Sequence, residues 1–441
     1  MAEQKAEGGR IARIRASTTF KILVIGFLML VLLIPAGMVQ SLIRERECRQ
    51  SEVIREISSK WGQAQTIQGP ILSVPYRVAS RTGDGSGYAV QHSLRILPEN
   101  LSITGDVRTQ LRYRGIYEAV LYTAKARLAG DFVLPDLKEL GLSERDLDWS
   151  RATISVGLSD MKGINEDIRA TLNGAEVVLN PGMETAALQG PGVSARVGLR
   201  RAPEKLAFSL DIDLNGSRRF ALVPVGRVTT VELSSGWPSP SFDGSFLPAE
   251  RRVGKDGFTA QWKVLHLNRS YPQFWTDNAY QTDDSVFGVS LVIPTDSYLK
   301  STRTAKYAAL FIALTFLAFF ISETMRRIRI HPFQYLLIGL ALIVFYTLLI
   351  SISEHLSFGK GYLVASAATI ALITGYARSV LRKQSLALLV GSLLTVLYAY
   401  LYVLLQLEDY ALLLGSIGLF VILGLVMFLT RKVDWYAAGD A

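Results

Sequence analysis

Four histidines and one cysteine are the residues of this chain best suited to nucleophilic, acid–base or metal chemistry. His92, His266, His331 and His355 are far apart, and none has a second histidine or a cysteine at the spacing of metal ligands. Cys48 stands alone, which excludes an intramolecular disulfide and a cysteine-rich metal site. The sequence also lacks the G-x-S-x-G, P-loop, G-x-G-x-x-G and H-E-x-x-H motifs. We therefore expect no enzyme activity, no metal and no cofactor.

Polar residues beside apolar stretches are the next candidates, because charge within lipid is costly and usually has a function. Five such residues fall at the ends of apolar runs and none at mid-run: Lys306, Glu323, His331, Glu354 and His355. Lys306 and Glu323 can each extend toward a membrane interface. The adjacent Glu354 and His355 could relay protons or sense external pH, and the alternative is a solvated turn that caps two helices. The absence of mid-run charge disfavours an ion-coupled transporter.

A proline- and aromatic-rich segment, residues 236–248, is a second candidate site. Its three prolines and two glycines predict an irregular loop, yet its aromatic side chains are too apolar for a loop free in solvent. Either the segment packs down as a clamp over the end of a sheet, or it displays an aromatic binding surface. The candidate residues are Trp237, Pro238, Phe242, Gly244, Phe246, Leu247 and Pro248.

Apolar runs long enough to cross a bilayer must position these polar residues. Residues 22–43 follow a basic tail, residues 1–21, and have no cleavage site after them, so we expect an uncleaved signal anchor. Five further spans are predicted at about 305–323, 333–352, 361–377, 385–407 and 410–429, within a domain of residues 304–430 that ends in a tail of residues 431–441. Cations mark alternate connections, namely Arg326, Arg327, Arg329, Arg378, Arg382, Lys383, Arg431 and Lys432. By the positive-inside rule these connections and both termini are cytoplasmic.

The net charge of +9 does not indicate a nucleic-acid-binding protein. Residues 44–303 carry 32 cations and 30 acids, so the largest region is nearly neutral. The excess positive charge flanks the apolar runs, where it reports membrane topology rather than a phosphate-binding patch.

The periodicity of residues 69 to about 300 changes from helical to strand-like. Apolar residues alternate with polar ones in at least eight segments, among them 120–128, 206–214 and 258–264. Asn173-Gly174 and Asn215-Gly216 stand between such runs, and both predict β-hairpin turns. We expect a large antiparallel β-rich region outside the membrane, as one domain or two.

Several motifs in a fixed order carry a family resemblance. They are Ala305-Lys306-Tyr307, Ser322-Glu323-Thr324, His331-Pro332-Phe333-Gln334-Tyr335-Leu336, Ser353-Glu354-His355, the segment of residues 237–248, and Asp434-Trp435. In these motifs, which span the chain almost end to end, the sequence resembles the CreD family of bacterial inner-membrane proteins. The resemblance implies an envelope-integrity protein of Gram-negative bacteria, produced under a two-component system and associated with envelope stress. It brings no established catalytic residues.

The resulting expectation is an α+β membrane protein with one N-terminal and five C-terminal transmembrane helices. A large antiparallel β-rich periplasmic domain, residues 44–303, is inserted between the first and second helices. The leading hypothesis is a non-enzymatic protein whose partners are the bilayer and an envelope component, which is a periplasmic protein, peptidoglycan or the outer membrane. The alternative is a transporter or lipid-handling protein, which predicts a polar cavity through the bundle. A stress sensor is a weaker third hypothesis, because the cytoplasmic segments are too short for a signalling domain.

Overall fold

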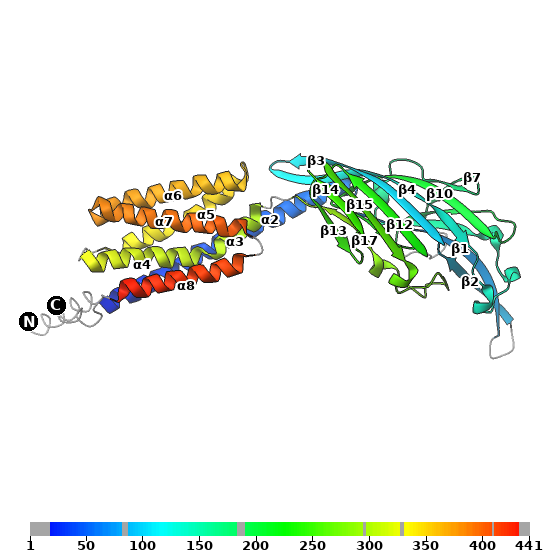
Figure 1. Ribbon diagram of the computed structural model, residues 1–441, viewed down its shortest axis with the longest axis horizontal. Coiled ribbons are helices and arrows are strands. Elements are labelled where there is room, and N and C mark those ends of the chain that lie inside the picture. The colour runs from blue at the N-terminus through cyan, green and yellow to red at the C-terminus, as the bar shows by residue number, and fades with distance from the viewer. Residues whose placement is uncertain are drawn as a thin grey trace, which may run out of the picture. The chain divides into compact units, whose positions relative to one another are not determined.

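The chain folds into two compact units, one of helices and one of strands (Figure 1). The computed structural model describes residues 18–81, 87–182, 190–293, 297–326, 330–407 and 410–431. The β unit is Ser51–Pro294, and the helical unit combines Met1–Gln50 with Thr295–Ala441. Helix α2 (Thr18–Trp61) contributes residues to both units.

The first sheet of the β unit, sheet A, has nine strands. Its path runs β13-β17-β11-β1-β5-β9-β8, and β2 pairs with β1 and with β16. The strands are β1 (Gln65–Arg81), β2 (Gly87–Ile96), β5 (Thr153–Leu158), β8 (Asn180–Pro181), β9 (Gly192–Arg196), β11 (Arg219–Val223), β13 (Pro240–Gly244), β16 (Phe274–Thr276) and β17 (Phe287–Leu291).

The second sheet, sheet B, has eight strands in the order β14-β15-β12-β3-β4-β10-β6-β7. They are β3 (Asn100–Arg114), β4 (Tyr117–Val133), β6 (Arg169–Leu172), β7 (Ala175–Val178), β10 (Lys205–Ser217), β12 (Val228–Ser235), β14 (Glu250–Gly254) and β15 (Gly257–Leu265). Short 3-10 helices lie at Leu137–Leu140, Glu144–Asp146, Trp149–Arg151, Met161–Gly163, His266–Asn268 and Asp283–Ser285.

The two sheets pack face to face around one apolar core. The alternating residues predicted on β10 and β15 point into it, as their strictly alternating burial shows. Aromatic rings join the sheets: Tyr122 of β4 meets Phe220 of β11, and Trp262 of β15 meets Phe287 of β17. A single core cluster draws on both sheets, so the strand-rich region is one domain.

The sheets are mixed, which differs from the purely antiparallel arrangement expected from the sequence. Most neighbours are antiparallel, but β1 pairs with β11 in parallel, and so does β3 with β12. Alternating apolar residues predict which face of a strand is buried, but they do not specify the direction of its neighbours.

Of the two predicted hairpin turns, one is confirmed and one is wrong. Asn173 and Gly174 have φ of 47° and 89° and join β6 to β7, as a type I′ turn requires. Asn215 and Gly216 instead lie inside β10 opposite Thr123 and Tyr122. The glycine is needed there for space, because a Cβ atom would lie 2.4 Å from the Tyr122 ring.

The C-terminal end of α2 is anchored within the β unit. Trp61 donates its indole N–H to the Tyr122 carbonyl oxygen at 3.2 Å. One turn earlier, Glu56 pairs with Arg114 of β3. Hydrogen bonds from Arg114 and then Lys60 lower the pKa of Glu56 to about 2. The helix therefore continues beyond its apolar run, and this last part belongs to the β unit.

The helical unit contains α3 (Ser297–Lys306), α4 (Ala308–Arg326), α5 (Pro332–Ser353), α6 (Phe358–Leu381), α7 (Gln384–Gln406) and α8 (Ala411–Thr430) as well as most of α2. Four helices, α2, α5, α6 and α7, are long and apolar enough to cross a bilayer. Helices α3 and α4 meet at a bend of 43° and make a fifth if they form one span.

The predicted count of six spans is therefore not reached by these criteria. The apolar part of α8, Leu413–Leu425, is shorter than a full span among the described residues. Three of the eight cations that predicted the orientation, Arg327, Arg329 and Lys432, lie outside the described residues, and so do both tails up to Ser17 and from Lys432. The sixth span and the orientation stay predictions.

Candidate functional site

An open groove of about 1330 Å³ runs over the solvent face of sheet B. Its lining comes from six neighbouring strands, β12, β3, β4, β10, β6 and β7, and consists mainly of charged and hydroxyl side chains. Strand residues that alternate with the core face point to this surface, so the same period-2 pattern produces both the core and the groove.

Opposite charges face each other across the strands of this groove. In one row, Arg127 of β4 lies opposite Asp211 of β10, which in turn lies opposite Arg169 of β6. In the next row, Lys125 lies opposite Asp213. The Arg127 and Asp211 side chains are 63% and 76% exposed and 4.0 Å apart, so water and ligands reach both.

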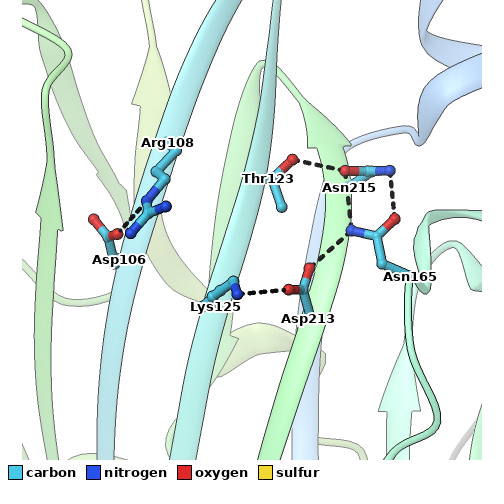
Figure 2. A network of polar contacts seen from close by, with 7 residues as sticks. All are labelled: Asp106, Arg108, Thr123, Lys125, Asn165, Asp213 and Asn215. Carbon is cyan, nitrogen blue, oxygen red and sulfur yellow. Dashed lines mark hydrogen bonds and ion pairs between the residues drawn. The ribbon is translucent and has the colours of Figure 1, made fainter.

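A hydrogen-bond network fixes one end of the groove (Figure 2). Asp213 forms an ion pair with Lys125 Nζ at 3.3 Å and accepts a hydrogen bond from Asn165 Nδ2 at 2.8 Å. Asn165 and Asn215 bond to each other through their side-chain amides, and Thr123 donates to Asn215 Oδ1 at 2.8 Å. The Asp213 carboxylate is only 17% exposed and is held in place before any ligand arrives.

The chemistry of this groove is recognition through hydrogen bonds and charges of both signs. Carboxylates accept, whereas Lys125, Arg127 and Arg169 donate, and Thr104 and Ser209 offer hydroxyls. Such a surface suits a polar polymer that carries hydroxyl, amine and carboxyl groups. Sequence reasoning missed it because its residues come from six strands that are distant in the chain, and only the register brings them together.

The candidate segment of residues 236–248 is more regular than its prolines predicted. Pro240–Gly244 forms strand β13, which pairs with β17 at the edge of sheet A. A proline is tolerated there because an edge strand has one side without ladder hydrogen bonds. Gly244 has φ of 99°, and a Cβ atom on it would lie 2.2 Å from the Val286 carbonyl oxygen. The loop prediction is therefore wrong for these five residues.

The aromatic side chains of this segment pack onto the β unit. Phe242 lies edge-on to Phe258 and Trp262, with ring centroids 5.5 and 5.7 Å apart. Phe246 lies edge-on to Phe287 at 5.7 Å. Trp237 donates its indole N–H to Val292 O at 3.0 Å. These contacts match the alternative in which the segment packs down onto the sheets as a clamp.

The remaining candidates of the segment are less buried. Pro238 and Gly244 are exposed, Pro248 is half-buried, and Leu247 is 70% exposed. Among the large apolar side chains of this segment, Leu247 is therefore the most exposed. The segment offers one exposed apolar residue rather than an aromatic surface.

A histidine–aspartate pair, His92 and Asp277, lies on the same unit and could not be predicted from sequence spacing. His92 Nδ1 is 2.7 Å from Asp277 Oδ2, and the imidazole stacks on Tyr76. Burial raises the Asp277 pKa, but the bonds to His92 and to the Ser93 N–H outweigh it, with a further contribution from Arg95, so the pKa is lowered. The partners are 185 residues apart in the chain, which is why spacing could not reveal the pair.

Glu323 is the most enclosed charged candidate, and the structure places it in the interior of the helical unit. Its residue is only 4% exposed. Glu323 Oε1 accepts from Lys21 Nζ at 2.7 Å and from the Ile330 N–H at 3.1 Å, and Oε2 accepts from the Tyr335 hydroxyl at 3.1 Å. One carboxylate thus joins α2, α4, α5 and the connection between α4 and α5.

His331 has a local structural role at the start of α5. Its Nδ1 accepts from the Phe333 N–H at 3.2 Å, and its own N–H donates to Gln334 Oε1 at 2.9 Å. Pro332 occupies the first helical position, where its missing N–H costs no hydrogen bond. The His-Pro-x-Gln motif therefore forms a capping box in which histidine is the N-cap residue.

Glu354 and His355 do not contact each other through their side chains in the described structure. Glu354 accepts from the Tyr298 hydroxyl at 3.0 Å and lies 3.8 Å from Arg46 Nε. His355 is exposed. Lys306 is exposed at the end of α3, away from both. Among the five polar candidates, only Glu323 is buried, and none is brought together with another.

Metal ligation has no support in the described residues, where no group of three His, Cys, Asp or Glu side chains could hold an ion. The fold and the groove define an α+β membrane protein with a large ligand-accessible β-sandwich between its first helix and the remaining ones.

Comparison with known proteins places the chain more closely. The family model described as "Inner membrane protein CreD" matches residues 17–436. The chain is 33% identical to the inner membrane protein CreD of Escherichia coli (strain K12) over 416 residues, which covers 92% of this chain and 91% of that protein. The chain belongs to the CreD family of inner membrane proteins.

Proposed function

We propose that this protein maintains the integrity of the bacterial cell envelope without catalysing a reaction. In this proposal the helical unit anchors the chain in the inner membrane, and the β unit binds an envelope component. Family membership supports the membrane location. The groove of sheet B is the single observation that carries the binding role, because it is a large, polar and solvent-accessible surface on a rigid sheet.

The proposed topology has six spans with both termini in the cytoplasm and the β unit in the periplasm. It rests on the cations that alternate between the connections, such as Arg378, Arg382 and Lys383 between α6 and α7. In this topology the groove faces the space between the inner membrane and the cell wall.

Peptidoglycan is the envelope component that fits the groove best. Its sugars present hydroxyl groups, and its peptides present both amines and carboxylates, which match the paired charges of Arg127, Asp211 and Arg169. Asp213, whose side chain is only 17% exposed and accepts a hydrogen bond from Asn165, lowers the cost of ordering the site. A periplasmic protein or an outer-membrane component would bind the same groups less completely, because neither repeats this mixture at regular intervals.

The helical unit favours an anchor over a transport path. Its interior between α4, α5, α6 and α7 is filled by aromatic rings, with Phe345 4.6 Å from Tyr398 and 5.6 Å from Tyr362, and with Phe311 5.0 Å from Tyr398. A transporter needs polar groups that line a continuous path, whereas these rings pack against one another.

The binding role is tested with the full chain in lipid nanodiscs and purified peptidoglycan. Co-sedimentation of the wild type is compared with that of the double variant Arg127→Ala, Asp211→Ala. Both side chains are well exposed, so the fold should persist while ligand hydrogen bonds are lost. We expect binding to weaken about tenfold or more, since two charge-assisted hydrogen bonds are removed.

Arg252→Ala is the matched control, because Arg252 is exposed on strand β14 of the same sheet but does not line the groove. It should bind as the wild type does. Equal sedimentation of the wild type and the groove variant would refute the groove as the binding surface. Failure of the wild type to sediment, together with groove-dependent capture of a purified periplasmic protein, would exclude peptidoglycan.

A further inference from the structure

A second cavity lies within the helical unit, and its lining is apolar, whereas that of the groove is charged and polar. It has a volume of about 330 Å³, is partly open, and is lined by α4, α7, α8 and the end of α3. Its walls are apolar, with Leu310, Phe311, Leu397, Leu404 and Leu419 among them. The volume is at the lower end of the range of about 300–1,000 Å³ for small-molecule sites.

The position of the cavity along the helices places it in one half of the bundle. It contacts the first turns of α4, the second half of α7 and the first half of α8. Because these three parts line one cavity, they lie at the same end of the helical unit. A cavity that begins at this end and runs alongside the spans has the place of an acyl chain in one leaflet.

Lys306 lies at the mouth of the cavity and is its only charged lining residue. The side chain is exposed, and no described residue forms a hydrogen bond or ion pair with it. The bend of 43° between α3 and α4 occurs directly after Lys306. Arg303 on the preceding turn adds positive charge at the same helix end. Among the described residues, the lining of the mouth therefore carries positive charge and no carboxylate where the apolar walls begin.

Glycines of α8 leave room for the cavity because they have no side chain. Gly415 lines the cavity, and a Cβ atom there would meet only Leu404 at 3.7 Å. Gly418 lies so close to Tyr400 that a Cβ atom would be 2.2 Å from its hydroxyl oxygen. That hydroxyl donates to the Leu414 carbonyl oxygen, so the ring is fixed as a wall between α7 and α8.

We propose that this cavity is a binding site for a phospholipid with an anionic head group, whose acyl chain lies between α4, α7 and α8 and whose phosphate contacts Lys306. The surrounding bilayer supplies acyl chains, so apolar complementarity selects for a lipid. Charge complementarity selects the head group, because a basic side chain beside a pocket between membrane helices attracts an anionic one. The site is independent of the groove on the β unit and of its ligand.

The test measures lipid binding to the purified full chain in mild detergent by native mass spectrometry. Phosphatidylglycerol and phosphatidylcholine with identical acyl chains are the two probes, so they differ in head-group charge alone. We expect the wild type to retain phosphatidylglycerol preferentially. Lys306→Gln should reduce this preference about fivefold, the effect of one basic residue at a membrane surface.

Two further variants separate the charge from the cavity. Lys360→Gln removes an exposed cation of the same unit that does not line the cavity, and it should leave the preference unchanged. Gly415→Leu retains Lys306 but fills the cavity, and it should reduce binding of both lipids. Glycerol phosphate, which has the anion without the chain, should not compete.

Three results would each overturn the proposal. They are equal retention of the two lipids by the wild type, an equal loss of preference in the Lys306 and Lys360 variants, and full competition by glycerol phosphate. The last result would identify a site for a soluble anion. A folded Gly415→Leu protein with unchanged lipid retention would show that the acyl chain lies elsewhere.

Discussion

The two units of this protein use charge in opposite ways. On the β unit, ion pairs such as Arg127 with Asp211 and Arg169 with Glu176 lie on the surface, with more than half of each side chain exposed. In the helical unit, Glu323 is nearly inaccessible and satisfies three donors at once. Exposed pairs are weakened by water and salt, and buried ones are costly to break.

This difference separates charges that can bind a ligand from charges that stabilise the fold. A surface charge whose partner contributes little can exchange that partner for a ligand at small cost, which suits the groove of sheet B. A buried carboxylate that joins three helices has no such freedom, so Glu323 holds the helical unit together. Its interaction with Lys21 also connects the first helix of the chain to a segment 302 residues later.

The largest effect is expected from Glu323→Ala. The substitution leaves the Tyr335 hydroxyl and the Ile330 N–H without an acceptor, while Lys21, whose side chain is 35% exposed, can turn to solvent. We expect a loss of about 3 kcal/mol in the free energy of unfolding of the helical unit. Steric-trap unfolding in bicelles measures it, and Asp211→Ala is the surface counterpart, with an expected loss below about 1 kcal/mol. Equal losses would contradict the comparison.

Phe242→Ala should have the next largest effect and should act on the β unit. The ring loses its contacts with Phe258 and Trp262, but it is only half-buried, so the expected loss is about 2 kcal/mol rather than the 3–5 kcal/mol of a fully buried phenylalanine. Chemical denaturation followed by tryptophan fluorescence measures it. Leu247→Ala is the control, because its side chain is 70% exposed and its loss should be below about 0.5 kcal/mol. A neutral Phe242→Ala would instead favour a displayed aromatic surface.

A double-mutant cycle on Lys125 and Asp213 sharpens the account of the groove. The pair is 3.3 Å apart, but Lys125 is 62% exposed, so we expect a coupling energy below about 1 kcal/mol that decreases in high salt. A coupling of several kcal/mol would mean that these charges are structural, as Glu323 is, and would weaken the proposed binding role.

The smallest effect is expected from the pH dependence of Asp277. Its pKa is lowered in the folded protein, so the carboxylate stabilises the fold above the unfolded pKa of about 3.9. This stability is lost as the pH falls through the lower folded pKa. Asp277→Asn, which suits the φ of 53°, should therefore be slightly less stable than the wild type at pH 6, and the difference should shrink as the pH falls below the unfolded pKa of about 3.9. A difference that persists at low pH would exclude the charge as its cause.

Particular residues show how far the sequence could predict the structure. The buried faces of β10 and β15 followed from period-2 alternation, and the turn at Asn173-Gly174 followed from dipeptide chemistry, because both are local. Asn215-Gly216 predicts a turn equally well but lies inside a strand, because the ring of Tyr122, distant in the chain, requires a glycine there. Pro240 predicts a loop, but it lies in a strand at the edge of a sheet, where a proline is tolerated.

Hydrophobic length, periodicity and motif order are properties of the chain alone, so they were enough to predict a membrane protein of the CreD family with a large β-rich region. Which polar residues act together became visible in the folded protein. It enclosed Glu323, separated Glu354 from His355, packed the aromatic rings of residues 236–248 onto the sandwich and aligned Arg127 with Asp211. Strand register and helix packing set these distances, and they depend on contacts between residues far apart in the chain.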